Sequence, residues 1–270
     1  MADEQNDESD VVERCCIMEI LEYGSKENKS IIFIHGFQCP YQIWNRYIDY
    51  YKEKYHVIIP ILEGHNPKKK EKFVSLQQSA KEIEDFYISN YGTDVYAVYA
   101  ISYGGIIAAN IWQNRRLNIS KLIFDGSPLT SYPKILKSYL TKFYIQVTHK
   151  SQRRDKKTLA QAVKGICPKE HLDDFLQVMD NMSDENIRSY IEAWSNYKLP
   201  KNIDTATTKV YFFYGTKSNE ILARKSAKYI KRYYSNSEII RLNGKGHCET
   251  ALFDPDEMIN YLNKILFCDR

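Results

Sequence analysis

The sequence predicts an α/β fold in which helices cover both faces of a mostly parallel central sheet. Short apolar runs alternate with segments of helical spacing, and this alternation is typical of parallel sheets. One apolar run, residues 95–101, leads directly into Ser102 and then Gly104 and Gly105, as a sharp strand-to-helix turn requires. Of the 270 residues, 43% are hydrophobic, so the chain can bury a sizeable core.

The expected strands are apolar runs that stop at glycine, proline or polar residues. They span residues 16–23, 31–34, 55–59, 95–101, 121–126, 209–215 and 238–242. Apolar residues at helical spacing predict helices between these strands and near the end of the chain. These helices span residues 75–87, 105–114, 221–234 and 255–267.

The segment between residues 126 and 209 is too long for a simple crossover. It holds about eighty residues with helical periodicity, whereas α/β units usually join strand and helix through loops of roughly 2–6 residues. We therefore expect residues 129–204 to form a helical lid above the carboxyl ends of the strands, where open α/β sheets bind ligands. Residues 14–128 and 205–270 then form the core, and the acidic residues 1–13 a disordered tail.

Composition argues against several other classes of protein. The net charge is +4, and the basic residues cluster locally, at 67–72 and 149–157, without the broad basic face of a nucleic-acid-binding protein. No apolar run approaches the roughly 18 residues of a membrane span. The six cysteines match no zinc-binding spacing, so we expect reduced thiols, no metal and no organic cofactor. The acidic N-terminus lacks the features of a secretory signal, which favours a cytoplasmic protein.

Ser102 is the predicted nucleophile. A serine on a strand-to-helix turn exposes its hydroxyl beside the backbone N–H groups that open the helix. Gly104 provides the small residue that the turn needs two positions later, whereas Ala100 stands where the G-x-S-x-G pattern has its first glycine. The simpler interpretation is a serine tolerated in a turn.

His247 is the predicted base, because it lies in a glycine-framed loop after a strand and a neutral imidazole can accept the serine proton near pH 7. None of the other five histidines combines these features. The His-Gly-Phe turn at 35–37 ends a buried strand. Its glycine would let the N–H of Phe37 face the site, so the N–H groups of Phe37 and Tyr103 are the predicted oxyanion hole.

The carboxylate that would orient the imidazole has two candidates. Glu220 is the only acid in the loop after the 209–215 strand, although a solvated glutamate at a helix start would have the same sequence. Asp125 ends the strand that follows the serine turn. Asp204 lies before its strand and would point to the wrong end of the sheet. We favour Glu220 and keep Asp125 as the alternative.

These residues resemble the α/β-hydrolase superfamily, in particular its lidded branch of esterases, thioesterases and proline iminopeptidase-like enzymes. The chain order serine, acid, histidine is that of the family. Three features depart from it, namely Ala100, Ile61 where the family often has aspartate, and the late position of Glu220 in its loop. The likeness covers about residue 16 to the end of the chain and rests on 35–37, Trp44, 60–65, 100–105, 125–128 and 246–247.

The resemblance and the residues together imply a serine hydrolase that cleaves a small to medium carboxylic ester or thioester through an acyl-enzyme intermediate. Its partner would be a small-molecule acyl substrate. An acyltransferase or an aminopeptidase would use the same residues, and the latter needs a carboxylate cluster to hold the substrate amine. A different class of alternative is a catalytically poor protein of the same fold that binds a small ligand. The acids that could hold such an amine are Glu170, Asp173 and Asp174. The expected lid also has aromatic and basic residues that would either line a positively charged mouth or form lid core and solvated charge. They are Tyr139, Tyr144, Arg153 and Arg154.

Overall fold

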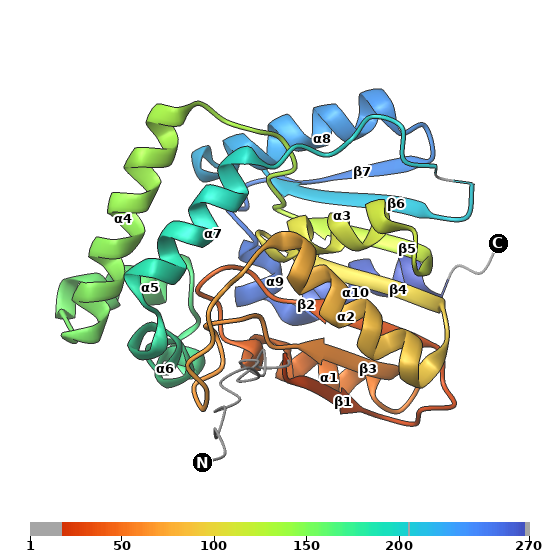
Figure 1. Ribbon diagram of the computed structural model, residues 1–270, viewed down its shortest axis with the longest axis horizontal. Helices are drawn as coiled ribbons and strands as arrows, with labels where there is room; N and C mark the ends of the chain where they lie inside the picture. The colour runs from red at the N-terminus through yellow and green to blue at the C-terminus, as the bar shows by residue number, and fades with distance from the viewer. Residues whose placement is uncertain (1–17, 205, 268–270) are drawn as a thin grey trace, which may run out of the picture.

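A seven-stranded sheet forms the centre of the protein (Figure 1). The computed structural model describes residues 18–204 and 206–267, so the expected tail at 1–13 lies outside the described residues. The strands follow the spatial order β1-β3-β2-β4-β5-β6-β7, and all neighbours are parallel except β1 and β3. Their bounds are β1 Ile20–Tyr23, β2 Ser30–Ile34, β3 His56–Pro60, β4 Asp94–Ile101, β5 Asn118–Asp125, β6 Lys209–Gly215 and β7 Ser237–Leu242.

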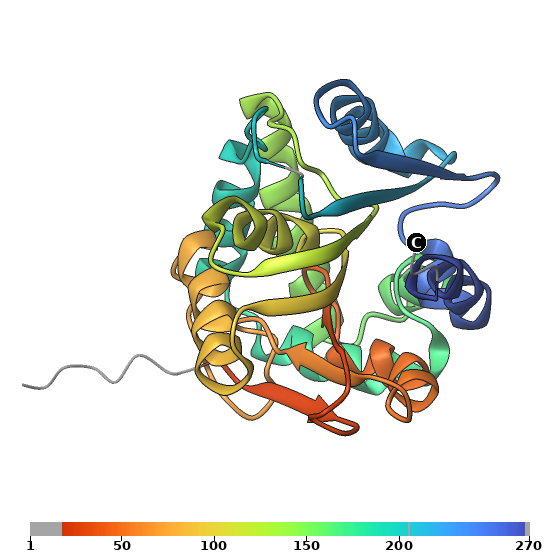
Figure 2. The ribbon, with the colours of Figure 1, turned by 90° about the vertical axis from the view of Figure 1, so that its right-hand side faces the viewer.

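Helices cover both faces of this sheet, because the central strands are apolar on both sides. One face packs under α2 (Leu76–Tyr91), α3 (Gly104–Asn114) and α8 (Ile221–Tyr233). The other packs under α1 (Asn45–Tyr51) and α10 (Pro255–Leu266). Figure 2 shows the two layers on opposite sides of the strands. The predicted mostly parallel sheet with helices on both faces is confirmed.

Alternate residues of each strand supply the two cores, as the two-residue period of a strand requires. In β4, Val98 and Ala100 belong to the core under α2 and α3, whereas Tyr99 and Ile101 belong to the core under α1 and α10. Most of β2 to β6 is fully buried. The carboxyl ends of these strands are therefore held firmly, and residues that follow them are well placed for a site.

Four α-helices lie between β5 and β6, and we call this segment the insertion. They are α4 (Lys134–Gln152), α5 (Lys156–Gly165), α6 (Leu172–Asn181) and α7 (Asp184–Asn196). They gather beyond one end of the sheet, at the left of Figure 1. The chain enters and leaves the insertion at adjacent points, since Leu199 N–H donates to the Leu129 carbonyl at 3.0 Å.

Several elements differ from the sequence prediction, among them the short helix α9 (Glu249–Phe253), which was not expected. Residues 41–51 form a short 3-10 turn followed by α1, although no helix was expected there. The first strand runs antiparallel to β3 at the edge of the sheet, and periodicity alone does not encode strand direction. None of the described helices is both long enough and apolar enough to cross a bilayer.

Candidate active site

Ser102 lies on the sharp turn between β4 and α3. Its φ of +49° is in the left-handed region, which costs a residue other than glycine on the order of 1–3 kcal/mol. Two backbone hydrogen bonds hold this conformation: Ser102 N–H donates to the Asp125 carbonyl at 2.8 Å, and Gly105 N–H donates to the Ser102 carbonyl at 3.1 Å. The turn directs the serine hydroxyl away from the buried strand.

The two glycines after the serine are required by close packing. A Cβ on Gly104 would lie against the His35 carbonyl oxygen and 2.6 Å from that of Ile34, both rigid backbone atoms of the β2 end. A Cβ on Gly105 would overlap the Ser127 hydroxyl. Ala100, by contrast, is fully buried and fits within β4. The alanine therefore does not disturb the turn.

His247 joins the serine to a carboxylate. Its Nε2 lies 2.9 Å from Ser102 Oγ, and its Nδ1 lies 2.5 Å from Glu220 Oε1. An ionised carboxylate only accepts hydrogen bonds, so Nδ1 carries the proton and Nε2 is free to accept from the serine hydroxyl. This is the protonation state that a general base needs.

Glu220 is fully buried at the end of the 3-10 turn Ser218–Glu220. Its second oxygen, Oε2, accepts the Gly215 N–H at 2.8 Å. Two N–H groups, one from β6 and one from His247, thus compensate the buried charge, as burial of a carboxylate demands. The structure brings Ser102, His247 and Glu220 into one hydrogen-bonded chain.

Asp125 has a different position. Its Oδ2 accepts from the Tyr99 hydroxyl at 3.1 Å, and its Oδ1 has no partner among the described residues. Burial, together with the nearby charge of Glu220, raises the pKa of Asp125 to about 7. No hydrogen bond joins the Asp125 carboxyl to His247 within the described part of the chain. Asp204, the third acid considered, pairs with Arg115 at 3.0 Å.

The backbone of residues 36–38 lies beside the serine. A Cβ on Gly36 would lie 3.1 Å from Ser102 Cβ, so glycine allows this close approach. Phe37 and Tyr103 line the same cavity as Ser102, and their N–H groups reach no acceptor in the described residues. Both predicted oxyanion donors are therefore at the site with unused hydrogen bonds.

Two buried histidines shape this backbone. His65 Nε2 accepts the Gln38 N–H at 2.8 Å, and His35 Nε2 accepts the Leu62 N–H at 3.1 Å. Burial lowers the pKa of both rings, that of His35 to about 4, so both are neutral. Neither ring was predicted to have this role, although His35 precedes Gly36 at the end of β2 and His65 follows Gly64 in the segment after β3.

Comparison with known proteins identifies the fold. No protein-family model and no curated protein matches the chain. Among solved structures, a protein assigned to the α/β hydrolase family of Desulfitobacterium hafniense is similar, with 17% identity, a TM-score of 0.71 and coverage of 92% of this chain and 100% of that one. The chain has the α/β-hydrolase fold.

Two further similar proteins with solved structures are described as esterases. One is from the study of carboxylesterases of Nitrososphaera gargenis, with 16% identity, a TM-score of 0.72 and coverage of 93% and 94% of the two chains. The other is an esterase from Exiguobacterium antarcticum, with 16% identity, a TM-score of 0.70 and coverage of 93% and 95%. At such identities the likeness concerns the fold.

A small cavity of about 90 Å³ adjoins the serine, at the place where the α/β-hydrolase fold brings the strand ends together. The insertion contributes Tyr144 from α4, Ile166 after α5 and Trp194 from α7. No aspartate or glutamate lines the cavity among the described residues, nor do three metal-ligating side chains gather anywhere in them. The other lining residues are Gly36, Phe37, Gln38, Cys39, Ile101, Ser102, Tyr103, His247, Cys248 and Leu252.

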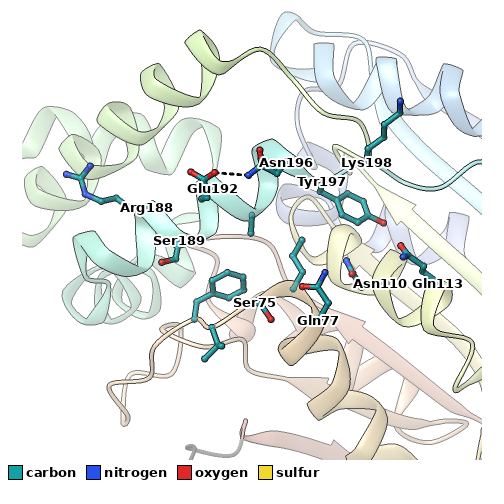
Figure 3. A pocket seen from close by; sticks show the side chains of 14 residues that line it. Ser75, Gln77, Asn110, Gln113, Arg188, Ser189, Glu192, Asn196, Tyr197 and Lys198 are labelled. Carbon is teal, nitrogen blue, oxygen red and sulfur yellow. Dashed lines mark hydrogen bonds between the residues drawn. The ribbon is translucent and has the colours of Figure 1, made fainter.

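A larger hollow of about 690 Å³ lies elsewhere, between the start of α2, the outer side of α3 and α7 (Figure 3). Its lining is mixed, with Gln77 and Gln113 on one side and Glu192 and Asn196 on the other. It contains neither the serine nor the histidine of the hydrogen-bonded chain. The smaller cavity, which contains both Ser102 and His247, is therefore the candidate active site.

Proposed function

We propose that this protein is a serine hydrolase that cleaves a small to medium carboxylic ester or thioester through an acyl-enzyme intermediate. The observation that carries the proposal is the chain of hydrogen bonds from Ser102 through His247 to Glu220. A nucleophile, a base and an orienting carboxylate in this order are what serine acyl transfer requires. The esterases among the structural neighbours support the same reaction class.

In the first step, Ser102 Oγ attacks the substrate carbonyl carbon while its proton moves to His247 Nε2. The carbonyl oxygen becomes negative and accepts hydrogen bonds from the N–H groups of Phe37 and Tyr103. The tetrahedral intermediate then collapses, the bond to the alcohol or thiol breaks, and Nε2 returns the proton to the leaving group. Glu220 keeps the other ring proton on Nδ1 and stabilises the imidazolium.

In the second step, water replaces the leaving group. His247 Nε2 takes one proton from the water as its oxygen attacks the acyl carbon. The same two N–H groups stabilise the second oxyanion, and the proton passes to Ser102 Oγ as the acyl bond breaks. Transfer to an acceptor other than water would need the same residues. The free carboxylic acid leaves and the serine is regenerated.

The cavity supports an uncharged and short acyl group. Its walls are mainly apolar, and its volume of about 90 Å³ accommodates only a few carbon atoms unless the walls move. We assign residues 129–204 the role of a lid, because three side chains of the insertion line the cavity that contains the serine. Such a lid excludes water from the reacting carbonyl.

An aminopeptidase receives less support. It needs a carboxylate near the serine to hold the substrate amine, and the cavity lining has none in the described chain. Glu170 and Asp173 are exposed on the insertion, and Asp174 pairs with His171 at 3.3 Å.

A fluorophosphonate probe tests the proposal, since it reacts only with an activated serine. We expect covalent labelling of the folded wild type and none of Ser102→Ala. A folded wild type that stays unlabelled would contradict the proposal and favour a ligand-binding protein. A panel of p-nitrophenyl esters of increasing chain length, with acyl-CoA thioesters beside it, then identifies the acyl group.

A further inference from the structure

The outer face of α4 carries an exposed apolar stripe. Ile135, Tyr139 and Phe143 are 81%, 63% and 44% exposed, and their spacing of four residues places them on one side of the helix. The Tyr139 and Phe143 rings stack with centroids 6.2 Å apart. Single exposed apolar residues are ordinary, but a stripe over three successive turns marks an interaction surface. Figure 1 shows α4 at the outer edge of the molecule, away from the sheet.

Unpaired basic residues continue this face. Lys142, Lys150 and Arg153 lie three, eleven and fourteen residues after Tyr139, so helical geometry places them on the same side. All three are exposed and make no ion pair with any described residue. Between positions 134 and 169 the sequence has ten Lys or Arg and a single acid, Asp155. This first part of the insertion therefore presents positive charge beside apolar side chains.

The stripe is continuous with the lining of the cavity beside Ser102. Phe143 packs edge-on against Tyr144, with ring centroids 5.3 Å apart, and Tyr144 lines the cavity beside Ser102. Ile166 is exposed at the surface and also lines the cavity. A molecule held on the outer face of α4 would thus be near this cavity.

We propose that this face of α4 binds the surface of a bilayer that contains anionic lipid. Aromatic and aliphatic side chains enter the region between headgroups and acyl chains, while lysine and arginine attract the anionic headgroups. A second copy of the chain fits less well, because two such faces would bring like charges together. Nucleic acid would use the charges but leave the apolar stripe exposed. The proposal is independent of the catalytic role of Ser102.

Co-sedimentation with vesicles tests this surface. The probe is phosphatidylcholine vesicles with and without phosphatidylglycerol, and the protein is the full chain carrying Ser102→Ala, so that lipid hydrolysis cannot alter the vesicles. We expect at least tenfold tighter binding to the anionic vesicles, weakened by salt. The triple variant Ile135→Ser, Tyr139→Ser, Phe143→Ser should lower the affinity for anionic vesicles at least tenfold. A second triple variant, Lys142→Glu, Lys150→Glu, Arg153→Glu, should have the same effect.

Matched controls replace apolar residues of similar exposure away from α4. Val74→Ser and Ile221→Ser, at positions 65% and 66% exposed, should leave vesicle binding within twofold of the parent protein. Circular dichroism melting checks that every variant is folded. Binding that is equal for neutral and anionic vesicles, or unchanged in either triple variant, would overturn the proposal. Tighter binding to a duplex DNA of equal charge than to the anionic vesicles would also overturn the proposal. A dimer that dissociates only in the stripe variants would overturn it as well.

Discussion

The Nε2 atom of His65 accepts a hydrogen bond of 2.8 Å from the backbone N–H of Gln38. Gln38 directly follows Phe37, whose N–H is one of the two proposed oxyanion donors, and its own φ is +56°. His65 Nδ1 lies 3.1 Å from the Glu63 carbonyl, which fixes the ring tautomer. A side chain from the segment after β3 therefore determines the backbone conformation of the segment after β2.

This relationship predicts the effect of His65→Ala. Without the ring, the turn at 36–38 relaxes and the Phe37 N–H moves from the oxyanion. A donor of this kind contributes mainly to the transition state, so kcat should fall by about 10–100-fold while KM changes little. Ester hydrolysis kinetics measure both, and His149→Ala, at a partly exposed histidine of α4 that does not line the cavity, is the control. An equal rise in KM with unchanged kcat would contradict the positioning role.

Isosteric substitution should affect kcat far more at one candidate acid than at the other. Glu220→Gln removes the charge beside His247 Nδ1 and favours the wrong ring tautomer, so kcat should fall by roughly 10²–10⁴-fold. Asp125→Asn keeps the hydrogen bond from Tyr99 and should change kcat by less than about tenfold. The two variants are compared by their rates of fluorophosphonate labelling and by their kcat for ester hydrolysis. Greater loss in Asp125→Asn than in Glu220→Gln would reverse our assignment.

The raised pKa of Asp125 predicts how stability depends on pH. In an unfolded chain an aspartate has a pKa of about 3.9, whereas burial raises it to about 7 in the folded state. Between these values only the unfolded state loses the proton. The free energy of unfolding should therefore fall as pH rises through this window, by up to about 1.4 kcal/mol per pH unit for this group.

Asp125→Asn should make that dependence shallower and raise stability near pH 7 relative to the wild type. Urea unfolding of both proteins at several pH values between about 4 and 7 measures the free energy of unfolding and its dependence on pH. Parallel curves for the two proteins would show that Asp125 does not titrate there.

Gly104→Ala should destabilise the protein by roughly 2–4 kcal/mol, because the new methyl group meets two backbone carbonyl oxygens that cannot move aside. Gly165→Ala is the matched control, since a Cβ at that position would meet no atom within 4 Å beyond its own stretch of helix. That change should be neutral or stabilising by up to about 1 kcal/mol. Thermal unfolding of both variants measures the difference, and equal melting temperatures would argue against the packing at Gly104.

Trp194→Ala should shift the preferred ester to a longer acyl chain. The indole lines the cavity and packs edge-on against Tyr132 at 5.4 Å, so its removal opens space above Ser102. Each methylene that gains a place in an apolar pocket is worth about tenfold or more in kcat/KM. The hexanoate to acetate ratio should rise at least tenfold. An unchanged ratio would mean that the acyl chain lies elsewhere.

Much of the fold followed from the sequence because the buried strands are short, apolar and regularly spaced. The segment 209–215 was predicted with the bounds of β6, and most other strands within three residues. Helix α1 was not predicted. Its buried residues Tyr47, Ile48 and Tyr51 have helical spacing, but aromatic and β-branched side chains favour strands.

The site was predictable as far as local motifs define it. Ser102 and His247 each lie in a glycine-containing turn after a strand, so their neighbours in the sequence indicate their placement. Glu220 lies five residues beyond the end of β6, and only the 3-10 turn brings it back toward the sheet. The link between His65 and Gln38 joins residues 27 apart, so no local pattern could reveal it.

The hydrogen bond between Leu199 and Leu129 brings the start and end of the insertion together. Whatever lies between these two positions can lengthen, shorten or change sequence without altering the spacing of β5 and β6. The proposed lid and the proposed bilayer-binding face both lie in this segment, whereas Ser102, His247 and Glu220 all lie outside it. We therefore expect that replacing residues between these two positions would change the walls of the cavity and leave the three hydrogen-bonded residues in place.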